Sequence, residues 1–133
     1  MTALHDLPAT DMVAGYRAGT LSPVEVTEAV LAHIARWEPQ LQALYLPPTR
    51  PWFDEALAQA RASEDRWRRG QPLGPIDGVP LTLKDNIATA GDPTPLGTAA
   101  VPLVPATADA PPAARVRESG GVLVAKTTMP DYG

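Results

Sequence analysis

Cysteine is absent from the 133 residues of this sequence, and histidine occurs only twice, at His5 and His33. Without cysteine the chain has no disulfide framework, no thiolate metal site and no cysteine nucleophile. Two histidines are too few for a histidine-rich metal site. We therefore expect a protein that uses no metal and no other cofactor.

Excess positive charge and long apolar runs are missing as well. The formal net charge is -4 and the sequence pI is about 5.0, so bulk electrostatics favour neither nucleic acid nor an anionic membrane as a partner. No stretch approaches the roughly 20 apolar residues that span a bilayer. The first residues, "MTALHDLPATD", lack the charged start and apolar run of a signal peptide. We expect a cytoplasmic protein without nucleic-acid or membrane partners.

Hydrophobic residues make up 44% of the chain, enough for one domain with a real core, and 16 prolines and 10 glycines cut it into short elements. Periodicity of the apolar residues distinguishes helices from strands. The pattern predicts a helical pair over 9–38, helices over 52–69 and 111–118, and strands over 41–46, 79–84 and 122–126. This order predicts an α/β fold with N-terminal helices packed on a mixed, partly parallel sheet.

Capping signals locate the ends of several predicted helices. Gly19 is placed to close the first helix in a left-handed conformation. At the start of the second helix, Ser22 is the predicted N-cap and Pro23 occupies the first turn. Glu25 is three residues after Ser22, and its side chain can complete a capping box. Asp109 is expected near the N-cap of the helix over 111–118.

Two of the predicted strands end on a lysine, Lys84 and Lys126, and a helix lies between them in sequence. Such a strand–helix–strand unit pairs its strands in parallel through a right-handed crossover. Both lysines would then lie at the carboxyl edge of the sheet, where ligands bind in open α/β folds. We expect them to converge on one mouth, although a lysine at a strand end is most often only a solvated residue.

The surroundings of the two lysines are predicted to differ. A loop over 92–105 can fold over Lys84 and enclose it, whereas Lys126 leads into "TTMPDYG" and stays more open. Asp85 is expected to point away from Lys84, because a carboxylate beside the lysine would favour its charged form.

The stretch "GPIDGVPLTLKDNI" at the first lysine resembles the amidase signature family. The likeness continues in "GTLSPVEVTEAVLAHIARWEPQLQALY", in "PTPLGTAA" and in "DAPPAARVRESGGVLVAKTTMPDYG", so it covers nearly the whole chain. The resemblance implies a fragment of the amidase signature fold and identifies Lys84 as the base of a serine, cis-serine, lysine triad that cleaves carboxamides. The implied substrate is a small-molecule amide.

The serines of that triad have no counterpart here. The family's glycine- and serine-rich segment follows the region that matches "TTMPDYG", so the chain is expected to be the N-terminal portion of an amidase. Ser22 is a helix cap, Ser63 lies on a charged helix and Ser119 ends a helix. We expect the chain to supply the base without the nucleophile and to be inactive alone.

Four further residues are candidates for substrate binding. Thr94 and Thr98 offer hydroxyl groups, Gly97 allows close approach of the backbone, and Met129 could line an acyl pocket. The alternative is a tight turn for the first three and an ordinary core methionine for the last.

Two other functions stay open beside amide hydrolysis. One is a non-catalytic binding or assembly module that self-associates through exposed sheet edges. The other is a glutamine-dependent amidotransferase component, which would require a partner protein.

Overall fold

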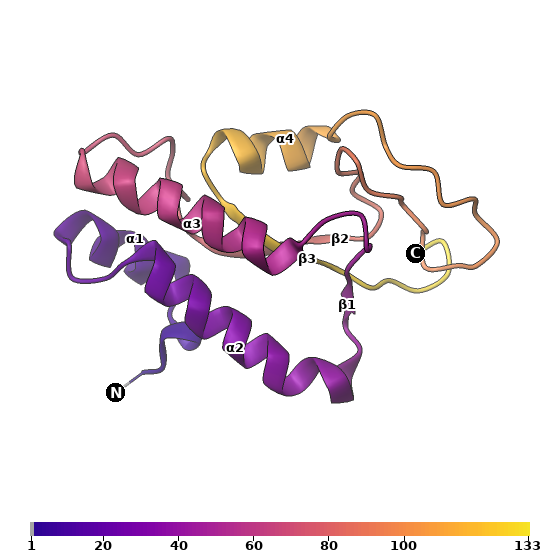
Figure 1. Cartoon of the computed structure of the whole chain (residues 1–133), viewed down its shortest axis with the longest axis horizontal. Helices are drawn as coiled ribbons and strands as arrows, with labels where there is room; N and C mark the ends of the chain where they lie inside the picture. The colour runs from indigo at the N-terminus through magenta and orange to yellow at the C-terminus, as the bar shows by residue number, and fades with distance from the viewer. Residues whose placement is uncertain (1) are drawn as a thin grey trace.

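The computed structural model describes residues 2–133 as helices gathered on a small mixed sheet (Figure 1). In chain order the elements are the 3-10 helix η1 (Leu4–Asp6), α1 (Ala9–Ala18), α2 (Pro23–Leu41), β1 (Leu44–Tyr45), α3 (Trp52–Arg68), β2 (Pro80–Lys84), α4 (Pro111–Glu118) and β3 (Val122–Thr127). The predicted α/β class, with helices on a partly parallel sheet, is confirmed. No helix within the described residues is both long and apolar enough to cross a membrane.

The sheet has the strand order β1-β3-β2, with β3 in the centre. β3 pairs in parallel with β2 and antiparallel with β1. The chain passes from β2 to β3 through a long loop and then α4. Helix α4 lies along the upper side of Figure 1. The predicted strand–helix–strand unit is therefore present, and no other strand lies between its two strands.

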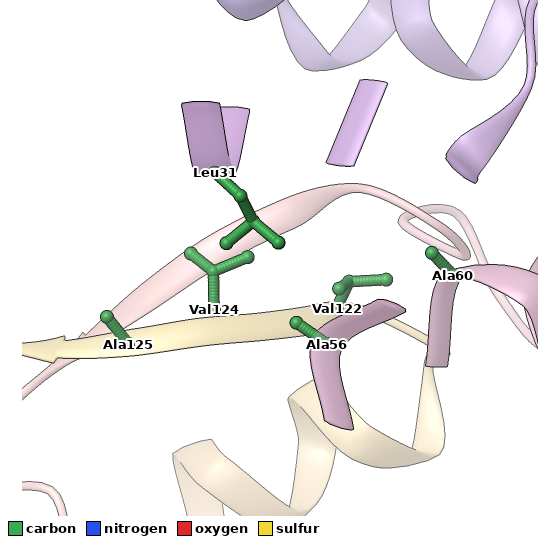
Figure 2. Close-up of a cluster of buried hydrophobic side chains, with 6 residues drawn as sticks. All are labelled: Leu31, Ala56, Ala60, Val122, Val124 and Ala125. Carbon is green, nitrogen blue, oxygen red and sulfur yellow. The ribbon is translucent and has the colours of Figure 1, made fainter. Parts of the chain in front are cut away.

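Apolar residues pack on both faces of β3. On one face, Val122 and Val124 meet Leu31 of α2 together with Ala56 and Ala60 of α3. Figure 2 shows Leu31 above the strand and the ribbon of α4 on the opposite side. On that second face, Leu83 and Leu123 of the two parallel strands pack with Ala113 of α4 and Trp52 of α3. Burial on both faces is why β3 is a nearly continuous apolar run.

Local capping signals operate as predicted at the first two helices. Gly19 takes the left-handed conformation, with φ of 69°, and ends α1. Ser22 accepts hydrogen bonds from the backbone N–H groups of Val24 and Glu25, while the Glu25 side chain accepts one from the Ser22 N–H. The capping box is complete.

Two local predictions were wrong. The strand expected over 41–46 is only Leu44–Tyr45, because α2 continues to Leu41 despite the proline inside it. The Glu38 carboxylate accepts the N–H groups of Ala43 and Leu44, and this ties the chain just past the helix to its last turn.

The other error concerns Asp109, which does not cap α4: the N-cap is Ala110, with no side-chain hydrogen bond. Instead the Asp109 carboxylate accepts the Ala90 N–H and pairs with Arg117. It therefore joins the loop to α4.

Candidate active site

The ends of β2 and β3 lie side by side, and each carries one of the two lysines. In the parallel ladder Leu83 is opposite Lys126, and Lys84 is opposite Thr127. Both lysines are therefore at the carboxyl edge of the sheet, as predicted.

The two lysines nevertheless point to opposite faces of the sheet. The register shifts between Leu81 and Thr82, so that one extra residue of β3 is accommodated there as a bulge. Beyond the bulge, Lys126 shares a face with its partner Leu83, while Lys84 lies on the other face with Thr82. The expectation that both lysine side chains converge on one ligand-binding opening was wrong.

The predicted difference in enclosure is also reversed. The Lys84 residue is exposed, as is Thr82, whereas Lys126 has a relative exposure of 0%. The reason is the position of the loop that follows β2. Its Leu96 and Gly97 N–H groups bind the Asp85 carboxylate, so the loop is held on the side to which Asp85 points. Since Asp85 is buried and Lys84 exposed, the loop leaves Lys84 open.

A second acidic residue, Asp92, anchors the start of the loop. Its buried carboxylate accepts hydrogen bonds from the hydroxyl groups of Thr49 and Thr89, at 2.8 and 2.7 Å, and from the Arg50 guanidinium. Burial alone would raise the pKa of Asp92, but the Arg50 and threonine hydrogen bonds outweigh it, and the pKa is lowered. Arg50 and Asp92 are 42 positions apart, and no local sequence signal pairs them.

The amino group of Lys126 lies in the same region and has no hydrogen-bond partner among the described residues. Burial lowers its pKa, and the charge of Arg50 acts in the same direction. The charges of Asp85 and Asp92 oppose this shift without cancelling it. We call Arg50, Asp85, Asp92 and Lys126 the buried charge cluster. Sequence reasoning missed the cluster, because only the register of the ladder turns Lys126 toward it.

The predicted substrate-binding residues lie in two segments that touch. Gly97 has φ of +68°, and a Cβ atom there would lie 2.6 Å from the Pro130 carbonyl oxygen and closer still to that of Met129. The Thr98 hydroxyl accepts the Ala100 N–H, as in a tight turn, and Thr94 is half-buried. The structure thus brings Gly97 and Met129 together, and their role toward a substrate stays a prediction.

All three serines are remote from Lys84. A Cβ on Gly78, which precedes β2, would lie 2.6 Å from the Ser63 hydroxyl and 2.9 Å from Pro23, the neighbour of Ser22. Ser119 packs against Gly74, still earlier in the chain. These residues gather before the amino end of β2, and the length of β2, about 13 Å at roughly 3.3 Å per strand residue, separates them from Lys84. Within residues 2–133, no group of three or more histidine, aspartate or glutamate side chains is placed to hold a metal ion.

Comparison with known proteins places this architecture in a family. The Amidase family model matches residues 25–133, and the chain belongs to the amidase signature family. It is 40% identical over 133 residues to a glutamyl-tRNA(Gln) amidotransferase subunit of Chloroflexus aurantiacus, covering 99% of this chain and 26% of the relative. It is 34% identical over 130 residues to an acylamidase of Rhodococcus erythropolis, with 98% and 26% covered.

Solved structures agree with the sequence relatives. The peptide amidase from Stenotrophomonas maltophilia superposes with a TM-score of 0.79 at 33% identity, over 96% of this chain and 26% of that one. A bacterial aryl acylamidase superposes with a TM-score of 0.80 at 26% identity, over 99% and 27%. The chain therefore spans about a quarter of the length of these relatives, with shares of 26 to 27%.

Proposed function

We propose that this chain is part of an amide-hydrolysing enzyme, to which it contributes Lys84 as the general base. The observation that supports the proposal most is the position of Lys84 in a member of the amidase family. It ends a parallel strand at the carboxyl edge of the sheet, and its side chain lies on the face that the loop leaves open. A nucleophile from protein outside this chain could reach the amine there.

The chemistry requires a lysine that can accept a proton. A serine hydroxyl becomes an effective nucleophile only when a base takes its proton, and lysine can do so only in its neutral form. By resemblance to the family, a bridging serine relays the proton from the nucleophile to Lys84. The serine oxygen then bonds to the amide carbon, the C–N bond breaks, and the leaving amine or ammonia carries the proton away.

Water completes the reaction in this proposal. It attacks the acyl-enzyme, releases the carboxylate and restores the serine hydroxyl. Backbone N–H groups of a glycine-rich loop stabilise the negative charge on the carbonyl oxygen in each step. This loop and both serines would come from the remaining three quarters of the family's length, of which the chain covers 26%.

The division between base and nucleophile can be tested with a serine-directed fluorophosphonate probe and an ammonia assay on several simple carboxamides. The isolated chain should take up no probe and release no ammonia, because Ser22, Ser63 and Ser119 all lie away from Lys84. Labelling of any of these serines, or turnover above that of a Lys84→Ala variant of the chain, would show that the chain carries its own nucleophile.

A second candidate function is supported by the 40% identity to a glutamyl-tRNA(Gln) amidotransferase component. Such a protein would use ammonia from glutamine for transfer to an acyl acceptor and would need a partner. The two functions separate on the amide donor in the complete protein: a strong preference for glutamine over simple carboxamides favours the amidotransferase, and the reverse favours hydrolysis.

A further inference from the structure

A row of three side chains crosses the sheet near its carboxyl edge. The register places Tyr45 of β1 and Leu83 of β2 on either side of Lys126 in β3, and paired residues share a face. Lys126 is in the centre of this row with 0% exposure. Asp85 follows Leu83 by two residues, and its N–H continues the pairing with β3, so it lies on the same face as Lys126. Burial raises the pKa of Tyr45, and the charges of Asp85 and Asp92 raise it further; the same two charges act on Lys126.

Asp85 connects this row to the loop. Its backbone N–H donates to the Thr127 carbonyl at 2.9 Å, which continues the strand pairing past Lys84. Its two carboxylate oxygens accept the N–H groups of Leu96 and Gly97, at 3.3 and 2.9 Å. Asp85 therefore fixes both the chain directly after Lys84 and the turn that touches Met129.

Asp85 as a whole residue is only 2% exposed. Among the described residues, the N–H groups of Leu96 and Gly97 are the only hydrogen-bond donors to its carboxylate. Arg50, the other cation of the buried charge cluster, is engaged by Asp92, Glu55 and the Ala90 carbonyl oxygen. A buried carboxylate is costly without positive charge nearby. Lys126 is the cation left to balance it.

We propose that Lys126 is a positioning residue: its buried amino group holds the Asp85 carboxylate in place and, through Asp85, fixes the turn at residues 94–98. Lys126 acts here by its charge, and its aliphatic stem only fills space. The inference does not depend on amide chemistry, and it would stand even if Lys84 had no catalytic role.

A double-mutant cycle on the full 133-residue chain tests the proposal, with backbone hydrogen exchange measured residue by residue. Lys126→Met keeps most of the volume and removes the charge. We expect it to speed exchange about tenfold at Leu96 and Gly97, the size expected for loss of a hydrogen bond to a charged group. Exchange at Gly78, which bonds Gly120 at the other end of the sheet, should stay unchanged.

The cycle is completed by Asp85→Asn, which removes the carboxylate. In that background Lys126→Met should have no further effect on Leu96 and Gly97, because the two groups act as one unit. Equal acceleration at all three amides, or the same effect in both backgrounds, would refute the positioning role. Lys84→Met, on the opposite exposed face, is the matched control and should leave all three amides as they are.

If Lys126→Met does not fold, the side-chain nitrogen of Lys126 can be titrated by NMR in the wild type and in Asp85→Asn. The pKa of Lys126 should fall further in the variant, since the Asp85 charge raises it while Asp92, Arg50 and Tyr45 are unchanged. An unchanged titration would show that Asp85 and Lys126 are not coupled and would overturn the proposal.

Discussion

Asp77 illustrates how one buried carboxylate can hold several segments together. It accepts hydrogen bonds from the Arg66 guanidinium at 2.8 and 2.6 Å and from the Leu73 N–H at 2.8 Å. Its carbonyl oxygen accepts the indole N–H of Trp67, and a Cβ on Gly120 would lie 2.5 Å from its carboxylate. Asp77 thus joins α3, the segment before β2 and the segment before β3.

Acid should weaken the fold through this residue. Burial would raise the pKa of Asp77, but the Arg66 and Leu73 hydrogen bonds outweigh it, so the folded pKa lies below the unfolded value of about 3.9. Stability from Asp77 is therefore fully present above about pH 5 and is lost as the pH falls through the folded pKa. Asp77→Asn should cost about 2 kcal/mol at pH 7 and flatten the acid limb of a urea-unfolding series.

Asp65→Asn is the matched control, because Asp65 lies on the same helix with its side chain 60% exposed. It should change the unfolding free energy little. An Asp77→Asn variant with the wild-type acid limb would contradict the assigned role.

The ends of the first two helices were predictable from neighbouring residues, whereas features that depend on contacts between distant segments were not; Asp109, which binds Ala90 and Arg117 and does not cap α4, belongs to the second group. Gly19 and the Ser22–Glu25 box mark helix ends within a few positions, and both operate as expected. The bulge beside Leu81 depends on how two strands meet, yet one extra residue moves Lys126 to the other face. The motif around Lys84 was enough to identify it as a candidate. The surroundings of both lysines were misjudged, because they depend on this bulge.

The turn at residues 94–98 can be tested with a pair of glycine substitutions. Gly97 and Gly91 both have a positive φ, +68° and +86° respectively. A Cβ atom added at Gly97 would collide with the backbone of Met129 and Pro130, whereas one added at Gly91 would have no neighbour within 4 Å. Gly91→Ala should cost about 1 kcal/mol from the left-handed backbone alone.

Gly97→Ala should cost about 1 to 3 kcal/mol more, because the backbone segments must also separate. Chemical denaturation of both variants measures the difference. Equal costs would mean that the turn and the Met129 segment are not in firm contact.

At the scale of the molecule, both edges of the three-stranded sheet are unpaired within the described residues. β1 and β2 are both edge strands, and several large apolar side chains are exposed, among them Leu41, Leu73, Leu103 and Val104. Unpaired strand edges are templates for association with other chains.

We therefore expect the isolated chain to self-associate. Sedimentation velocity across a dilution series should show species larger than a monomer at the higher concentrations. A compact monomer that is stable to dilution and unfolds cooperatively would indicate a self-sufficient domain instead.

The most direct test of the account is the turnover of Lys84→Ala in a complete enzyme. A chimaera provides one, in which this chain replaces the matching 26% of the Stenotrophomonas maltophilia peptide amidase, to which it is 33% identical. Thr82→Ala, an exposed neighbour on the same face, serves as the control. If Lys84 is the base, Lys84→Ala should lower kcat by about 10²- to 10⁴-fold with unchanged thermal unfolding, and Thr82→Ala should keep near-normal turnover. Near-normal kcat in Lys84→Ala would contradict the assignment of Lys84 as the base.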